Sequence, residues 1–245
     1  MGKPESYISR IFGKDALKVR TFYGVNPHEG VFDASNDEVV LDQITFKGMD
    51  EARLLVVASH MVGHFAAPGP QTLPAYKMLE FAGRMGETGV SRVRNAKFSA
   101  IVRPDDVIEA CREGSFFRMN RGNREVAQMQ VFFSQLGVSA HQAGIFLEIA
   151  AQTIVENMAG KIGDKEQLYY PLILGFEDLM IFDQKPDIEY RVKPQVPGQL
   201  QEQNRFMAGA DIFNRKDELV AAVRGMSFEF ATAARANRYD RWNRR

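Results

Sequence analysis

The sequence predicts a mainly α-helical protein of two lobes, with a small β-hairpin near the N-terminus and extended N- and C-terminal arms. Most of the chain after residue 50 repeats apolar residues at intervals of three and four, which places them on one side of a helix. Alternation of apolar and polar residues, which is typical of strands, occurs at residues 17–23 and 39–46. Residues 1–16 carry only a small apolar set, which could dock on a surface but could not fold alone.

The two alternating segments are expected to form the hairpin. Gly24 and Gly48 end them, and Gly30 lies in the turn between them. After the hairpin, helices are predicted at residues 50–66, 73–85, 104–111, 126–136, 139–160 and 216–238.

Local signals set the boundaries of these helices. Pro104 is well placed in a first helical turn, and Ser139 is a good N-cap for the longest helix, which ends near Gly160. A further apolar segment covers residues 169–182, and the prolines of residues 185–198 indicate an extended connector. No internal repeat is visible in the sequence.

These elements suggest four parts of the chain: an N-terminal arm (1–16), an N-lobe (17–122), a C-lobe (123–215) and a C-terminal arm (216–245). With 245 residues and 45% hydrophobic content, the chain can bury a full core. Its one cysteine, Cys111, excludes an intramolecular disulfide, and no apolar run is long enough for membrane insertion.

Charge is segregated along the chain, although the formal net charge is zero. Residues 29–51 hold seven acids and one lysine, whereas residues 84–124 hold nine basic residues and five acids. The last thirteen residues hold five arginines and one aspartate. A neutral chain of this kind can still present one strongly positive groove and one acidic face.

The centre of the basic segment is residues 116–124, in which three arginines alternate with aromatic residues, asparagines and a glycine. Guanidinium groups match phosphate oxygens, and aromatic faces stack on unpaired bases without reading sequence, so the segment suits single-stranded RNA. The alternative is a solvated turn between two core helices, with its arginines paired to nearby glutamates.

Enzymatic motifs are weak by comparison. His60 and His64 are four residues apart, which on a helix would place two imidazoles on one face that could hold zinc, but no third ligand is apparent. Cys111 falls on a predicted apolar face, where a thiol is usually inert. The phosphate-binding, dinucleotide-binding and nucleophile-elbow glycine motifs are absent from the sequence. The chain is therefore expected not to be an enzyme and to need no cofactor.

Several short motifs resemble nucleoproteins of segmented negative-strand RNA viruses. The sequence Tyr-Tyr-Pro-Leu-Ile-Leu-Gly at 169–175 is similar to the Phe-Tyr-Pro-Leu-x-Ile-Gly stretch of orthobunyavirus nucleoproteins. Phe-Tyr at 22–23 and Gly-Val-Phe-Asp at 30–33 resemble their N-terminal elements, although alanine follows Asp33 where those proteins have proline. Asn-Arg-Glu-Val-Ala at 123–127 and Gly-Phe-Glu-Asp at 175–178 are similar to emaravirus motifs.

The resemblance implies a two-lobed helical protein that encapsidates single-stranded RNA non-specifically and oligomerises through its terminal arms, in the virion and the host cell cytoplasm. A viral polymerase is a further expected partner. The candidate RNA-binding residues are Arg92, Arg94, Lys97, Phe116, Phe117, Arg118, Arg121, Arg124, Tyr169 and Tyr170. The candidate oligomerisation residues are Tyr7, Ile8, Ile11, Phe12, Leu219, Val223 and Phe230.

Three other interpretations stay open at this point. Ser-Phe-Glu-Phe at 227–230 is similar to a Phe-Asp-Phe element in coat proteins of flexuous plant-virus filaments. A metal-dependent enzyme using His60 and His64 is the second, and a cellular helical scaffold that binds no nucleic acid is the third.

Overall fold

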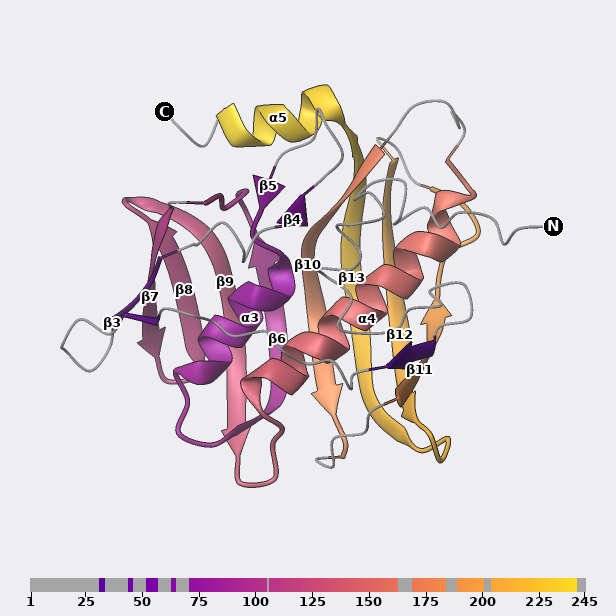
Figure 1. Ribbon diagram of the computed structural model, residues 1–245, viewed down its shortest axis with the longest axis horizontal. Coiled ribbons are helices and arrows are strands. Elements are labelled where there is room, and N and C mark those ends of the chain that lie inside the picture. Colours follow the sequence, from indigo (N-terminus) through magenta and orange to yellow (C-terminus); the bar gives the residue numbers. More distant parts are fainter. Residues whose placement is uncertain are drawn as a thin grey trace.

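The computed structural model describes residues 31–33, 44–45, 52–56, 63–64, 71–104, 106–162, 169–183, 189–200 and 204–241. Strands dominate these residues (Figure 1). The strands are β1 (Val31–Asp33), β2 (Ile44–Thr45), β3 (Ala52–Val56), β4 (Gly63–His64), β5 (Gln71–Thr72), β6 (Gly89–Phe98), β7 (Val107–Glu113), β8 (Phe116–Arg121), β9 (Arg124–Ser134), β10 (Tyr169–Ile181), β11 (Glu189–Gln195), β12 (Arg205–Asn214) and β13 (Leu219–Thr232). The helices are α3 (Ala75–Arg84), α4 (Ala140–Ala159) and α5 (Ala233–Arg241).

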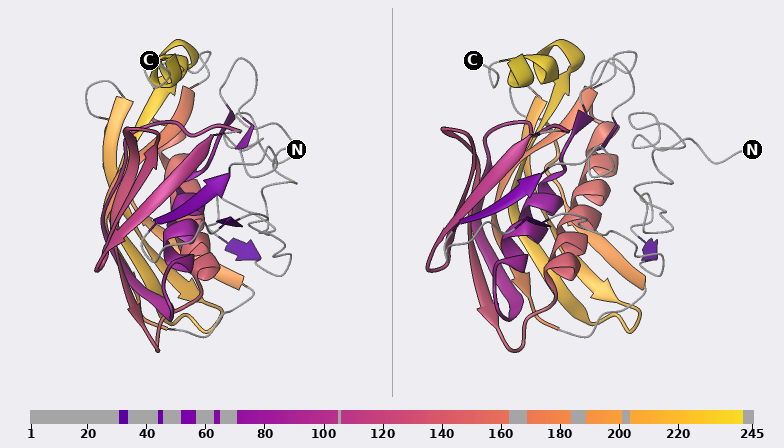
Figure 2. Two further views of the ribbon diagram at one scale, coloured as in Figure 1. Left: turned by 90° about the vertical axis from the view of Figure 1, so that its left-hand side faces the viewer. Right: turned by 60° about the vertical axis from the view of Figure 1, so that its left-hand side comes forward.

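One antiparallel sheet of eleven strands forms the body of the protein, in the order β1-β11-β12-β13-β10-β6-β9-β8-β7-β3-β2. A separate pair, β4 and β5, lies beside it. Helices α3 and α4 both cover the concave side of the large sheet, and α5 crosses one end of it (Figures 1 and 2). The opposite, convex side of the sheet is called the outer face below.

The topology contains an internal repeat that is not visible in the sequence. Helix α3 is followed by β6 to β9, and α4 is followed by β10 to β13. In the sheet the two sets appear as β11-β12-β13-β10 and β6-β9-β8-β7, which is the same strand order read outward from the β10–β6 junction. Each half is therefore one helix followed by four strands, and an approximate two-fold axis relates the halves.

Apolar side chains between the helices and the sheet form the core. Phe146 of α4 meets Tyr190 of β11 edge-on, with ring centroids 5.4 Å apart. Phe206 stacks on Phe228 and Phe230, at 4.9 and 5.4 Å between centroids. These rings bury large apolar areas on both strands and helix, so α4 is fixed firmly on its half of the sheet.

Helix α5 is attached by a buried ion cluster. Glu229 of β13 is fully buried and accepts a hydrogen bond from Arg205 Nε of the adjacent strand β12 at 2.8 Å. Arg235 of α5 forms an ion pair with the same carboxylate. Ala236 of α5 packs with Tyr170 in a small second core. No helix among the described residues is long and apolar enough to cross a membrane.

The predicted mainly α-helical fold is wrong. Only two predicted helices are confirmed: residues 73–85 contain α3, and residues 139–160 contain α4, where the Ser139 hydroxyl caps the helix by accepting from Gln142 N at 3.0 Å. Three of the other predicted helices contain strands: β3 within 50–66, β7 across 104–111 and β9 across 126–136. The helix predicted at 216–238 is the strand β13 as far as Thr232, and only its end, from Ala233, is helical as the start of α5. The basic segment 116–124 is the β8–β9 hairpin rather than a hinge, with Gly122 at a φ of 58° in the turn.

Irregular strands explain these errors. The register between β6 and β9 shifts at two places, so the buried positions of β9 do not alternate along its whole length. Val126, Met129 and Phe133 consequently recur at intervals of three and four and imitate a helix. In the same way, β13 carries Leu219, Val223 and Phe230 at helical spacing although it lies between β10 and β12.

The structure describes only part of the N-terminal region for which strands and an arm were predicted. The strand predicted at 17–23 and the arm at 1–16 lie outside the described residues. Within the second predicted strand, β2 pairs with β3, the segment that was expected to be helical.

We predict that Gly89→Ala destabilises the protein by about 1–3 kcal/mol, because overpacking forces backbone shifts. A Cβ on Gly89 would lie 2.3 Å from the carbonyl carbon and oxygen of Gly137, where the β9–α4 loop folds back. Urea unfolding of both variants would measure the effect against Gly160→Ala as control. A Cβ at Gly160 would meet nothing within 4 Å. A Gly89→Ala variant as stable as the wild-type protein would contradict the close approach of Gly89 to Gly137.

Candidate active site

Helix α4 carries a line of polar side chains on an otherwise apolar surface. His141, Glu148, Gln152 and Glu156 are spaced by seven, four and four residues, so they lie on one side of the helix. Glu148 is half-buried, and Gln152 Nε2 donates to its Oε1 at 2.9 Å. Gln152 is only 7% exposed, and its Oε1 has no hydrogen-bond partner within the described part of the chain. The buried amide thus fixes the position of the half-buried carboxyl group.

The polar side of α4 faces α3. A Cβ on Gly144 would lie 3.2 Å from the carbonyl oxygen of Tyr76, and His141 Nδ1 lies 3.4 Å from Glu80 Oε1. The two helices therefore run in opposite directions where they cross, so residues later in α4 lie closer to the N-terminal end of α3. Glu148 is one turn beyond Gly144 in that direction, which places it toward the N-terminal end of α3.

The β4–β5 pair lies at the same end of α3. His64 of β4 is in register with Gln71 of β5, and β5 leads through Leu73 and Pro74 into the helix. Figure 2 shows the pair on the same side of the large sheet as the helices. A histidine-bearing strand, the positive end of a helix dipole and a carboxyl group thus occupy one region.

A second polar cluster surrounds Glu80 on α3, whose side chain is fully buried. Lys77 Nζ lies 3.0 Å from Oε2, and Arg84 Nη2 lies 2.8 Å from Oε1, the oxygen that also faces His141. Burial alone would raise the pKa of Glu80, but the hydrogen bond with His141 and the charge of Lys77 outweigh it, so the pKa is lowered. Glu80 is therefore ionised at neutral pH.

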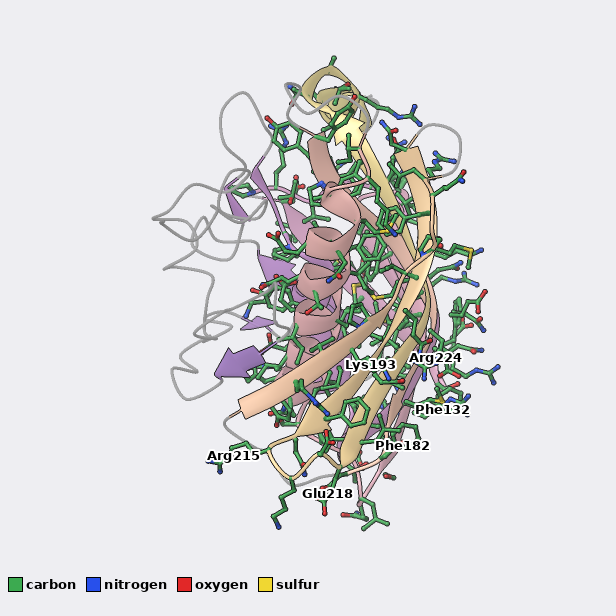
Figure 3. All side chains as sticks on the ribbon, turned by 90° about the vertical axis from the view of Figure 1, so that its right-hand side faces the viewer. Phe132, Phe182, Lys193, Arg215, Glu218 and Arg224 are labelled. Atoms are coloured by element: carbon green, nitrogen blue, oxygen red, sulfur yellow. The ribbon has the colours of Figure 1, made fainter. Side chains whose placement is uncertain are left out.

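The structure brings four of the candidate RNA-binding residues together on the outer face. Lys97 of β6 and Arg118 of β8 lie on either side of Gln128 of β9, and Arg94 and Phe116 lie in the same way on either side of Gln130. The Arg118 guanidinium is 5.3 Å from the centroid of the Phe116 ring. Figure 3 shows this side of the sheet edge-on, where Phe132, Phe182 and Arg224 are labelled.

The other candidates are placed differently. Arg92 and Arg121 form ion pairs with Asp178 and Asp106, and Arg124 is exposed at the start of β9. Phe117, Tyr169 and Tyr170 are buried. RNA binding by these residues stays a prediction.

The candidate oligomerisation residues are also spread over different environments. Val223 and Phe230 belong to the core, whereas Leu219 is 40% exposed at the start of β13. Tyr7, Ile8, Ile11 and Phe12 lie outside the described residues, as does His60. Among the side chains that the structure describes, no group of three or more His, Cys, Asp and Glu could hold a metal ion.

Comparison of the fold with solved structures identifies its type. An isomerase-inactive variant of GphF DH1 superposes with a TM-score of 0.57 at 12% identity, covering 79% of this chain and 97% of that one. The fold is that of polyketide synthase dehydratases. The dehydratase domain of RzxB from Pseudomonas fluorescens gives a TM-score of 0.55 at 9% identity, covering 73% and 94% of the two chains. The dehydratase domain from the CurJ module of the curacin polyketide synthase gives 0.53 at 8% identity, covering 79% and 98%.

No family model and no curated protein matches the sequence. At these identities the structural likeness establishes the fold, which is known as the hotdog fold.

These comparisons correct the interpretation of the sequence. The resemblance to viral nucleoproteins is wrong, because the structural neighbours are dehydratase domains. The predicted nucleoprotein function and the coat-protein alternative fail with it, as does the location in a virion and the host cytoplasm. The expectation of a non-enzymatic chain is contradicted too, because the solved structures that share the fold are enzyme domains.

Sequence reasoning singled out His64 but missed Glu148 and Gln152. The available signal was a glutamate and a glutamine four residues apart inside a long apolar helix. Such a pair lies on one helix face, and its position in an apolar context marks it as more than a solvated surface.

We predict that Glu80→Gln destabilises the fold by about 3–5 kcal/mol at pH 7, because it leaves the buried Lys77 ammonium without its counter-ion. Since folding lowers the pKa of Glu80, its stabilisation is fully present above the unfolded pKa of about 4.3 and is lost as the pH falls through the lower folded pKa. Urea unfolding from pH 7 to pH 3 should show the difference from wild type shrinking at acidic pH. The exposed Glu87→Gln is the control, and a difference that is constant with pH would refute the assignment.

Proposed function

We propose that this protein is an acid–base enzyme that eliminates water from a 3-hydroxyacyl substrate. The observation that carries the proposal is Glu148, held by Gln152 next to the N-terminal end of α3 and on the same side of the sheet as the strand that bears His64. The names of the structural neighbours, which are dehydratases of polyketide synthases, support the same class of reaction.

Elimination of water from such a substrate needs three contributions from the protein. A base removes the proton from the carbon next to the carbonyl group, an acid protonates the departing hydroxyl group, and a positive dipole stabilises the enolate oxygen. His64 is proposed as the base and Glu148 as the acid. The amide groups at the N-terminal end of α3 supply the dipole.

The proton and electron balance is simple in this scheme. The electrons of the broken C–H bond form the new double bond, and the C–O bond to the hydroxyl group breaks. The hydroxyl group leaves as water with the proton from Glu148, while His64 keeps the proton taken from carbon. Exchange with solvent then restores both residues.

The partners of the two carboxylates favour Glu148 over Glu80 as the acid. An acid must be able to hold a proton and release it. Gln152 is neutral and can hold a carboxyl group in either protonation state, whereas Lys77 and Arg84 keep Glu80 ionised.

We predict that Glu148→Gln lowers kcat for dehydration about 100- to 10,000-fold, the usual contribution of a positioned acid or base. The assay would follow conversion of the N-acetylcysteamine thioester of 3-hydroxybutyric acid to its 2-butenoyl product by absorbance. Glu113→Gln, at an exposed position on β7, is the matched control and should retain wild-type activity. Thermal unfolding would verify that both variants fold. A Glu148→Gln variant with the wild-type kcat would contradict the assignment of Glu148 as the acid.

A further inference from the structure

The outer face of the large sheet carries exposed apolar side chains near one end of its strands. Phe132 of β9 is 36% exposed, Leu219 of β13 is 40% exposed, and Phe182, directly after β10, is 55% exposed. Each points outward, because its neighbour along the chain packs in or against the core. Met180 and Phe213 are half-buried on the same face. These five residues are called the apolar strip below.

Strand pairing makes the apolar strip continuous across five adjacent strands, from β9 to β12. One row of paired residues runs from Phe132 of β9 through Arg92 of β6 to β10. In the next outward row, Phe182 follows β10, and Leu219 of β13 pairs with Phe213 of β12. Neighbouring strands are about 4.8 Å apart, so the strip is roughly 20 Å long, which suits the apolar centre of an interface between proteins.

Two ion pairs on the same face border the apolar strip. Arg92 Nε of β6 donates to Asp178 of β10 at 2.8 Å, and Arg224 of β13 pairs with Asp211 of β12. Because these four strands are adjacent, base, acid, base and acid alternate across the sheet. The four residues together carry no net charge, which distinguishes them from a surface for a polyanion or an anionic membrane.

The order of these charges fits a second copy of the chain. In a back-to-back pair, a two-fold axis along the strands and between β10 and β13 places β12 of one copy over β6 of the other, and β13 over β10. Register puts Arg92 and Asp211 in one row, and it puts Asp178 and Arg224 in another. Arg92 therefore faces Asp211 of the second copy, and Asp178 faces Arg224. Every base meets an acid, so the surface is complementary to itself.

The apolar residues match in the same arrangement. Met180 of β10 and Ala222 of β13 share a row, so each meets the other's counterpart in the second copy. Phe182 and Leu219 lie near each other on the same two strands, and they meet across the axis in the same way. Packed sheets are about 10 Å apart, a gap that side chains of this size fill from both sides.

We propose that the apolar strip is a docking surface for a second copy of this chain, with the two-fold axis between β10 and β13. Burial of the strip supplies the free energy of association, and the alternating charges fix the register of the two copies. A polyanion or an anionic membrane would instead prefer the cations Arg94, Lys97 and Arg118, which lie further along the strands, beyond the strip. The strip is on the opposite side of the sheet from α4, so association does not depend on the proposed dehydration (Figure 2).

The test measures sedimentation equilibrium of the full chain from about 1 μM to 1 mM, the range in which weak dimers dissociate. Wild-type protein should show a concentration-dependent dimer. Phe182→Glu places a charge at the centre of the strip and should raise the dimer Kd about 100-fold, as expected for a central interface residue. Leu136→Glu is the matched control, because Leu136 is 72% exposed in the loop after β9, outside the strip. It should leave the Kd unchanged.

Each other outcome counts against the docking surface. Wild-type protein that stays monomeric overturns it, as does a dimer that Phe182→Glu leaves intact or that Leu136→Glu disrupts as strongly. Monomeric protein that binds vesicles of phosphatidylserine and phosphatidylcholine, and loses this binding in Phe182→Glu, would identify a lipid surface as the occupant and overturn it too. Thermal unfolding identifies a variant that does not fold. Leu219→Glu, on the other central strand, then replaces Phe182→Glu with the same expected effect.

Discussion

The close crossing of α3 and α4 at Gly144 is the constraint on which the rest of the structure depends. Because glycine has no Cβ, the backbone of α4 approaches the Tyr76 carbonyl group closely; a Cβ there would lie 3.2 Å from the carbonyl oxygen, so even alanine would require a small local shift. Both helices lie on one sheet, so their separation also fixes the spacing of the two halves. The position of Glu148 beside the end of α3, and of Glu80 beside the start of α4, follows from this single contact.

The polar groups near the crossing show how much the immediate partners of a carboxylate decide its role. Glu80 and Glu148 occupy related places in the two halves, and each has a neighbour one turn or less away on its own helix. For Glu80 these neighbours are Lys77 and Arg84, which make it a fixed negative charge. For Glu148 the neighbour is Gln152, which positions it without adding charge. The fold repeats, but the chemistry of its two halves differs.

Sequence reasoning found the helices and missed the sheet for a physical reason. Helices α3 and α4 have local signals that do not depend on distant partners, including the Ser139 cap. The long strands β9 and β13 pass through register shifts, and their small or apolar outward residues, such as Ala222, blur the alternation that identifies a strand. Of the site, His64 was noticed only for its spacing of four residues from His60, which suggested a zinc pair on a helix. Glu148 was not noticed, because its place near the start of α3 follows from the crossing of Gly144 with Tyr76, which no local pattern reveals.

Three basic residues of the sequence pattern, Arg94, Lys97 and Arg118, lie exposed on the outer face, away from the helices. Strand alternation explains why they look like a site in the sequence. In β8 alternate residues enter the core, and in β6 the buried residues are Val90, Val93, Ala96 and Phe98. The residues between them include Arg94, Lys97 and Arg118, which neighbouring strands align across the sheet. Nearby arginines form ion pairs with aspartates, as Arg92 does with Asp178 and Arg224 with Asp211. Partly paired charge on a solvated sheet face favours solubility. The proposed proton transfer depends instead on polar groups of α4 inside the helix layer, where Gln152 is buried and Glu148 is half-buried.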